Sequence, residues 1–180
     1  SAYLSRSNFI EAAQAPLRHL MEVTGETANL AVMDNAEVVF VAQVETTNPI
    51  RAFFSAGTRA LMHSSGIGKA LLAQLPRHKV DGLLKTVGLP QYTSKTLITA
   101  KDLYADLDLT SARGWSFDEE ERYIGMSCVG AAICNAHGEV VGGISVSGPS
   151  VRFEAQHIAL IGAKVTTAAQ QVTLTLGGKI

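Results

Sequence analysis

The sequence predicts an α+β domain with an antiparallel sheet, and three observations support this prediction. Short apolar segments separated by turn signals are typical of strands. Helical periodicity appears in separate stretches, most clearly near the C-terminus. The 180 residues are 47% hydrophobic, which is enough for a substantial core. Because no internal repeat or linker interrupts this order of elements, we expect one domain over residues 1–180.

The N-terminal part of the chain predicts one helix and three short strands. Asn8 can cap a helix that runs to about residue 24 and stops at Gly25, although Pro16 should kink or break it. Turn signals at Asp34-Asn35 and Asn48-Pro49 then separate three apolar segments. These segments are expected to form an antiparallel meander, and they cover residues 27–33, 37–44 and 50–54.

The middle of the chain predicts three helices. The first covers residues 66–75, and the second runs from about 76 to 86. We expect these two helices to cover an edge of the sheet. The third begins at Thr99, in a pattern like a capping box, and ends at Gly114. A turn or short strand should then carry Asp118.

Two long apolar runs and a long helix complete the domain. Residues 128–134 and 140–147 flank a turn and predict a hairpin at the centre of the sheet. From about residue 154 to 176, apolar side chains recur at helical spacing until Gly177-Gly178 ends the run.

Composition excludes several classes of function. The formal net charge is −1 and the basic residues are scattered, so the chain alone should bind DNA poorly. No apolar run approaches the roughly 20 residues that cross a bilayer, and no signal peptide is evident. We therefore expect a soluble, cytoplasmic protein without a membrane contact. Cys128 and Cys134 would lie roughly 20 Å apart on one strand, at about 3.3 Å per residue, and cannot form a disulfide bond.

The stretch HSSGIGKA at residues 63–70 resembles the end of a phosphate-binding loop. A nucleotide P-loop needs glycine where His63 stands and Ser or Thr where Ala70 stands. Two required groups are missing, so ATP or GTP binding is not expected. The remaining question is whether the stretch binds a smaller anion.

Small polar residues at strand and helix ends form the candidate ligand site. Ser145 and Ser147 are two residues apart, which places both hydroxyls on one face of a strand. If the helix that begins near Gly66 crosses this face, its free N–H groups point at the hydroxyls and suit a carboxylate or phosphate. Asp118 is interpreted as a single inward carboxylate that recognises a ligand. The simpler alternative is that both serines are only polar strand ends.

Two other hypotheses use the same residues. Cys128 could be an enzyme nucleophile with His63 as its base, although burial in an apolar strand disfavours the thiolate. Alternatively, His63, Asp118 and Cys128 could converge on zinc in a metal-responsive sensor. The five histidines show no metal-ligand spacing, and we expect neither an enzyme nor a resident metal or cofactor.

Five stretches, in this order, resemble the effector-binding domain of the IclR-type bacterial transcriptional regulators. They are TGETANLAVMDNAEVVFVAQVE, MHSSGIGKALLAQLP, QYTSKTLIT, RGWSFDEEERYIGMSCVGAAI and GGISVSGPSVRF, and the resemblance runs from about Phe9 to Gly178. It implies a GAF/PAS-like fold with a curved antiparallel sheet flanked by helices, a long C-terminal helix and a ligand pocket over one sheet face. In that family a winged helix-turn-helix precedes this domain, so the chain resembles the regulatory half without its DNA reader.

The resemblance is greatest to the members that sense glyoxylate or pyruvate. It implies a small oxoacid effector, a homodimer or homotetramer, and DNA contacts made only through the N-terminal domain, as in a repressor. The implied ligand-binding residues of this sequence are Gly66, Ile67, Asp118, Cys128, Ser145 and Ser147.

The resemblance also implies a role for each group of the pocket. The N–H groups of Gly66 and Ile67, with the two serine hydroxyls, would hold the carboxylate. Asp118 would accept hydrogen bonds from hydrated glyoxylate, and Cys128 would shape the wall. This chain departs from the family where Ile67 replaces a frequent alanine, and where Ala52 and Ala60 make part of the apolar lining small. Which acid binds is therefore open.

Overall fold

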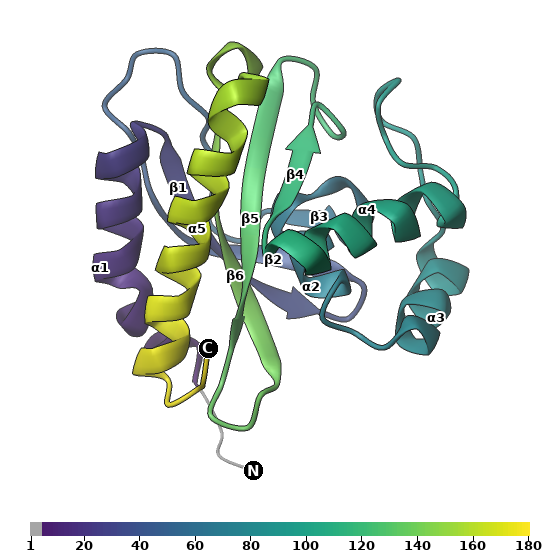
Figure 1. Ribbon diagram of the computed structural model, residues 1–180, viewed down its shortest axis with the longest axis horizontal. Coiled ribbons are helices and arrows are strands. Elements are labelled where there is room, and N and C mark those ends of the chain that lie inside the picture. The colour runs from purple at the N-terminus through teal and green to yellow at the C-terminus, as the bar shows by residue number, and fades with distance from the viewer. Residues whose placement is uncertain (1–4) are drawn as a thin grey trace.

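The computed structural model describes residues 5–180 and contains a curled six-stranded antiparallel sheet with helices on both faces (Figure 1). The order of strands across the sheet is β3-β2-β1-β6-β5-β4. This arrangement confirms the predicted α+β fold with a curved antiparallel sheet and a C-terminal helix. The strands are β1 (Thr27–Asp34), β2 (Glu37–Val44), β3 (Arg59–Leu61), β4 (Ser116–Glu119), β5 (Met126–Cys134) and β6 (Val140–Pro149).

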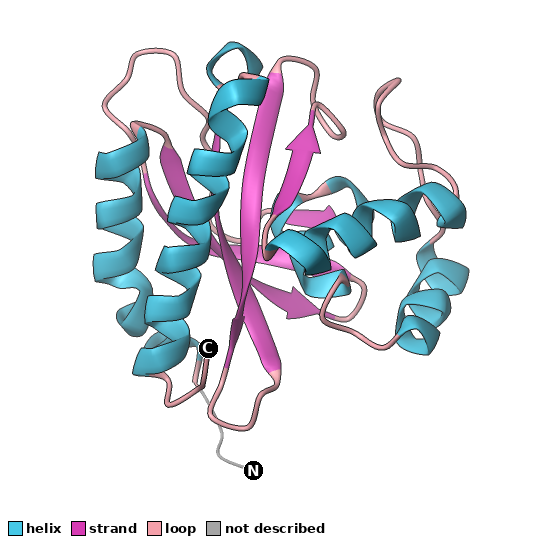
Figure 2. Ribbon diagram, in the orientation of Figure 1, coloured by secondary structure: helices cyan, strands magenta, loops and turns pink. Residues whose placement is uncertain are grey.

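Two long helices cover one face of the sheet, and three shorter ones lie against the other face and beyond its edge (Figure 2). The helices are α1 (Arg6–Thr24), α2 (Gly66–Leu72), α3 (Arg77–Val87), α4 (Ala100–Arg113) and α5 (Ala155–Thr175). Two single 3₁₀ turns, at Met62–Ser64 and Ser150–Arg152, precede α2 and α5. None of the helices between residues 5 and 180 is both long and apolar enough to cross a membrane.

The main hydrophobic core lies between the sheet and the pair α1 and α5, which run side by side in Figure 1. Alternate residues of the strands face this core, as a period of two requires. On β6, Ile144 and Val146 are fully buried beneath the two helices. Ser145 and Ser147 therefore point to the opposite face of the sheet.

Helix α1 differs from the prediction at its start and at its proline. Ser5, and not Asn8, is the N-cap, because its side chain accepts the N–H of Asn8 at 3.1 Å. Pro16 does not end the helix, which continues to a left-handed cap at Gly25. The loss of one backbone donor is offset by an apolar stripe packed on the sheet, formed by Phe9, Ala13, Leu17 and Leu20.

The third strand of the predicted meander was placed wrongly. Residues 50–54 form no strand, and β3 is instead the three-residue segment that pairs with the start of β2. The apolar segment is held by side chains, among them Thr27, Gln43 and Arg152, rather than by a ladder of backbone hydrogen bonds. Gln43 accepts the N–H of Phe54 at 3.1 Å and donates to its carbonyl at 3.0 Å.

The region after β3 also corrects two predictions. Helix α2 ends at Leu72, three residues before the predicted end. It packs on the face of β5 and β6 rather than on a sheet edge, while α3 and α4 lie beyond it in Figure 1. The predicted boundaries of α4 are confirmed: Thr99 accepts the N–H of Asp102 at 3.2 Å, and Gly114 ends the helix with φ of 89°.

Candidate ligand-binding site

The face of the sheet that carries α2 presents polar side chains from four adjacent strands. Residues that pair directly across antiparallel strands point to the same face. The pairing of β1, β6, β5 and β4 therefore places eight residues of this face in two rows. One row is Thr27, Ser147, Cys128 and Asp118, and the other is Asn29, Ser145, Gly130 and Ser116.

Two glycines let the first turn of α2 rest directly on this face. A Cβ at Gly130 would lie 2.7 Å from the backbone carbon of Gly66 and 2.8 Å from the nitrogen of Ile67. A Cβ at Gly143 would lie 2.7 Å from Cγ2 of Ile67. Ser116 also donates a short hydrogen bond to the carbonyl of Gly66. The start of α2 is therefore fixed against β5 and β6, beside the two serines.

The first turn of α2 presents backbone donors. Ser65 caps the helix by accepting the N–H of Gly68 at 3.1 Å. Gly66 and Ile67 occupy the first two helical positions, where an N–H group has no acceptor within the helix.

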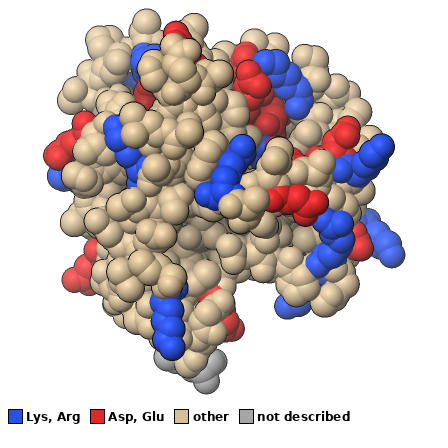
Figure 3. Space-filling model, in the orientation of Figure 1, with Lys and Arg blue, Asp and Glu red and all other residues tan. Residues whose placement is uncertain are grey.

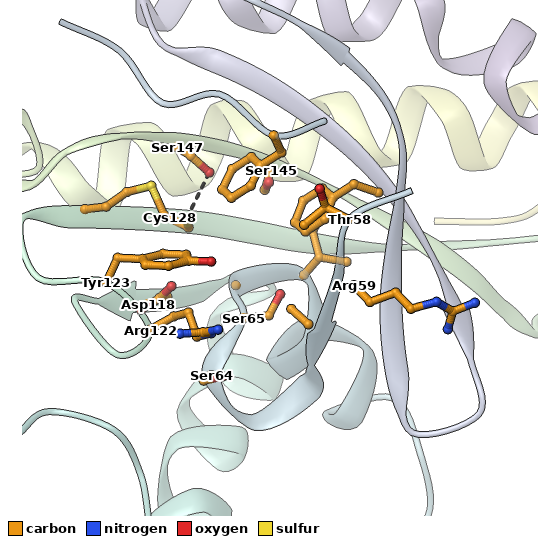
Figure 4. Close-up of a pocket in the computed structure, with 16 residues that line it drawn as sticks. Thr58, Arg59, Ser64, Ser65, Asp118, Arg122, Tyr123, Cys128, Ser145 and Ser147 are labelled. Atoms are coloured by element: carbon orange, nitrogen blue, oxygen red, sulfur yellow. Dashed lines mark hydrogen bonds between the residues drawn. The ribbon is translucent and has the colours of Figure 1, made fainter. Parts of the chain in front are cut away.

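A cavity opens between this turn and the polar face (Figure 4). All six residues that the sequence analysis placed in one pocket line it, namely Gly66, Ile67, Asp118, Cys128, Ser145 and Ser147. Ala60 lines it as well, but Ala52 does not, and the Ala52 carbonyl instead accepts a hydrogen bond from the Thr27 side chain at 2.8 Å. Only one of the two alanines expected in the apolar wall therefore belongs to it.

Several residues of this cavity were not anticipated. Phe40 and Phe54 form part of the wall as a stacked pair with ring centroids 4.7 Å apart. Arg122 and Tyr123 stand at the mouth, from the turn that follows β4. Strand alternation places Phe40 on this face, but neither Phe54 nor the turn residues belong to a periodic element that could have indicated them.

Asn29 was also missed, and it sets the hydrogen-bonding direction of both serines. Its side chain is fully buried, and Nδ2 donates to Oγ of Ser145 at 3.3 Å and to Oγ of Ser147 at 3.1 Å. Because each hydroxyl oxygen accepts from the amide, each O–H is left to donate. Asn29 Oδ1 has no partner in the described structure. The face thus offers hydroxyl donors to a group that accepts hydrogen bonds.

Cys128 reinforces this direction. Its Sγ lies 2.9 Å from Oγ of Ser147 (dashed line in Figure 4). Burial, together with the nearby carboxyl of Asp118, raises the pKa of the Cys128 thiol well above its usual range. The sulfur therefore keeps its proton and can donate it to Ser147, which leaves the Ser147 hydroxyl hydrogen for another acceptor.

Asp118 is the buried carboxyl of the site. It is 2% exposed, and its Oδ1 accepts the N–H of Glu121 at 2.8 Å. Burial, and after it the charge of Glu121, raise the pKa of Asp118 to about 7, although the Glu121 N–H and Lys69 oppose the shift. Near neutral pH, this carboxyl can therefore act either as an acceptor or as a donor.

Lys69, the lysine of the apparent phosphate loop, faces away from the cavity. It is fully buried, and Nζ lies 3.0 Å from Asp106 and 2.9 Å from Glu121. It also donates to the carbonyl of Phe117 at 2.6 Å. Burial acts to lower the pKa of Lys69, but the two carboxylates raise it overall. The lysine thus ties α2 to α4, to β4 beside Asp118 and to the turn that follows β4, and it is not a phosphate ligand.

His63 does not join Cys128 or Asp118. Its Nε2 lies 2.9 Å from the carbonyl of Pro90, and burial lowers its pKa. Within residues 5–180, no group of three or more His, Cys, Asp or Glu side chains could hold a metal ion. The geometry therefore supports neither the zinc site nor the cysteine–histidine pair that the sequence left open.

A cavity between a curved sheet and a short helix, lined by donors but without a nucleophile and base, is typical of a ligand-sensing regulatory domain. The chain belongs to the family of IclR-type bacterial transcriptional regulators: the family model "Bacterial transcriptional regulator IclR C-terminal" matches residues 1–174. The predicted family is confirmed, and its named relatives are transcriptional regulators rather than enzymes.

Known relatives agree with this assignment. The chain is 43% identical to the HTH-type transcriptional regulator BhcR of Paracoccus denitrificans, over 96% of this chain and 62% of that protein. It is 41% identical to the transcriptional repressor IclR of Escherichia coli, over 99% of this chain and 66% of that protein. The chain thus spans 62–66% of the length of these two regulators.

A solved structure shows the same fold. The crystal structure of the Thermotoga maritima IclR matches with a TM-score of 0.91 at 31% identity, over 96% of this chain and 70% of that chain.

Proposed function

We propose that this chain is the effector-sensing domain of a cytoplasmic transcriptional regulator, and that its effector is a small 2-oxo acid such as glyoxylate or pyruvate. The observation that carries the proposal is the orientation of the serine hydroxyls. Asn29 donates to both of them, so their hydrogens are available to a carboxylate. A carboxylate offers only acceptors, which fits a face that offers mainly donors.

Each group of the cavity has a role in this proposal. The N–H groups of Gly66 and Ile67 and the hydroxyls of Ser145 and Ser147 hold the carboxylate. Asp118 contacts the oxo group or the hydroxyls of its hydrate, and Cys128 forms the wall beside Ser147. The stacked rings of Phe40 and Phe54 favour a compact ligand, since they occupy one side of the same cavity.

The regulatory step requires no chemistry on the effector. An acid that prefers one arrangement of the domain shifts the equilibrium between arrangements in favour of that one. The shift reaches DNA through a winged helix-turn-helix supplied by another part of the regulator. A homodimer or homotetramer would match the symmetry of an operator. On the face in Figure 3, basic and acidic side chains are interspersed, so this domain alone is not expected to bind DNA.

Calorimetric titration of the chain with oxo and hydroxy acids of two to six carbons tests the proposal. Glyoxylate or pyruvate should bind, and Ser147→Ala should weaken binding by about ten- to a hundredfold, because a charge-assisted hydrogen bond contributes roughly 1.5–3 kcal/mol. Ser111, an exposed serine on α4, provides the control, and Ser111→Ala should bind as the wild type does. Tight binding of only a larger aromatic or sugar acid, unaffected by Ser147→Ala, would show that the ligand and its placement are wrong.

A further inference from the structure

Arg122 is a half-buried cation at the mouth of the cavity, held between two aromatic rings. Its Cζ lies 3.9 Å from the ring centroid of Tyr92 and 4.7 Å from that of Tyr123. The two tyrosines are 37% and 44% exposed, so the stack borders solvent on one side and the cavity on the other. Stacking covers the faces of the guanidinium but leaves its N–H edge free to bind an acceptor.

No carboxylate within residues 5–180 forms an ion pair with Arg122, although acidic residues surround it in the sequence. Glu121 pairs with Lys69, and Glu119 and Glu120 pair with Lys95. In Figure 4 the guanidinium lies beside Asp118 and Tyr123 and points toward Ser65, on the cavity side. The cavity therefore contains a positioned cation that no ion pair within residues 5–180 neutralises, although the buried carboxyl of Asp118 lies beside it.

Arg59 lines the same cavity and provides an internal comparison. Its guanidinium lies 2.7 Å from Asp34 and 3.3 Å from Glu37. In Figure 4 this side chain extends away from the other labelled residues. Arg59 is thus neutralised by the protein outside the cavity, whereas Arg122 is not.

We propose that Arg122 binds a second anionic group of the effector, so that 2-oxo dicarboxylic acids bind more tightly than monocarboxylic acids of the same length. This inference rests on the proposed function, in which the first carboxylate lies at Ser145, Ser147 and the start of α2. A guanidinium can hold a carboxylate through two parallel hydrogen bonds, and the aromatic stack fixes its plane before the ligand arrives.

The strand spacing sets the separation of the two anionic groups. Ser147, Cys128 and Asp118 are direct partners on three adjacent strands, so β6 and β4 lie about 10 Å apart at about 4.8 Å per strand. Arg122 follows β4 and reaches back over the mouth. The second anionic group must therefore stand a few bonds beyond the oxo carbon, which extends the effector range past three carbons.

Calorimetric titration with length-matched acids tests this inference. The pairs are 2-oxobutyrate with oxaloacetate and 2-oxovalerate with 2-oxoglutarate, and pyruvate is the reference. In each pair the dicarboxylate should bind about tenfold more tightly, as expected of one charge-assisted contact near solvent. Arg122→Gln should remove this preference and leave the affinity for pyruvate within about twofold. The matched control, Arg59→Gln, should keep the preference.

The outcomes separate this inference from the proposed function. One outcome is that the monocarboxylates bind, with an affinity that Ser147→Ala lowers, while the dicarboxylates bind no more tightly. In that case the assignment of Arg122 is wrong and the oxoacid site stands. A preference that persists in Arg122→Gln, or a loss of pyruvate binding in that variant, also overturns the assignment. If no acid of either series binds to the wild type, the proposed function is wrong and the role of Arg122 falls with it.

Discussion

The side chains on the two faces of the sheet are equally buried but differ in polarity, and β6 shows this contrast most clearly. Ile144 and Val146 are fully buried beneath α1 and α5, while Ser145 and Ser147 are 2% and 1% exposed on the other face. Burial alone therefore does not distinguish a core from a site. The distinction is that Ile144 and Val146 belong to an apolar core, whereas the two serines belong to a cluster of polar groups that need partners.

The two faces also differ in how closely a helix approaches. Large aliphatic side chains stand between α5 and the strands, whereas the backbone of α2 touches β5 at Gly130, with no side chain between them. Close approach brings the N–H groups of the helix start within reach of the same cavity as the strand hydroxyls. We propose that the core beneath α1 and α5 stabilises the fold, while the polar cluster beside the start of α2 provides selectivity for a ligand.

The largest expected effect comes from replacing, one at a time, two adjacent residues of β6 whose side chains lie on opposite faces of the sheet. Ile144→Ala should reduce the free energy of unfolding by about 2–5 kcal/mol, because it leaves a void in a fully buried apolar core. Ser145→Ala should cost no more than about 1 kcal/mol, since Asn29 still donates to Ser147. Urea unfolding measures both. Equal losses in the two variants would mean that the polar face carries as much of the stability as the apolar one.

The next effect concerns the direction of hydrogen bonds on the polar face. In Asn29→Asp, a carboxylate would accept from both serine hydroxyls and turn their hydrogens away from the cavity. Affinity for the oxoacid should fall by about a hundredfold, equivalent to about 2.7 kcal/mol, in calorimetric titration.

Asn8→Asp is the matched control for this substitution. Asn8 is exposed on α1, so the same change of charge there should leave the affinity unchanged. Circular dichroism verifies that both variants are folded. Retention of wild-type affinity in folded Asn29→Asp would show that Asn29 does not orient the serines.

The apolar face was largely predictable because its signals are local. The helical periodicity of α5 and the apolar runs of β5 and β6 each lie within one segment. The strand predicted at residues 50–54 is absent because the contacts of this segment are not local. That segment has the composition of a strand, but the side chains of Thr27, Gln43 and Arg152 hold it in place, and no local pattern indicates these contacts.

The polar face was predictable only in part, because its contacts join distant segments. A period of two placed Ser145 and Ser147 on one face, and the family resemblance placed the other expected residues in the same pocket. Asn29 is separated by 116 residues from Ser145, so only the register of β1 on β6 brings them together. Arg122 stands in a turn within a run of charges, where the sequence alone favours a solvated loop.

The smallest expected effect is the pH dependence of the free energy of unfolding that arises from Asp118. This carboxyl belongs to the polar face of the sheet. Its pKa is raised from 3.8 to about 7 in the folded protein, so the folded state binds the proton more tightly than the unfolded state. The stability of the wild type should therefore fall, relative to Asp118→Asn, as the pH rises from about 4 to 7.

Below about pH 4 the carboxyl is protonated in both states and the two proteins should differ by a constant amount. Because the pKa of the neighbouring Glu121 is also raised, its titration is coupled to that of Asp118, and the relative change should be about 1–2 kcal/mol rather than the full value of the shift. Urea unfolding at intervals from pH 4 to 8 measures it. Glu119→Gln, at an exposed carboxylate paired with Lys95, should follow the wild type. Parallel curves for wild type and Asp118→Asn would show that this carboxyl ionises as easily as one in water, and that the polar face is wetter than its burial indicates.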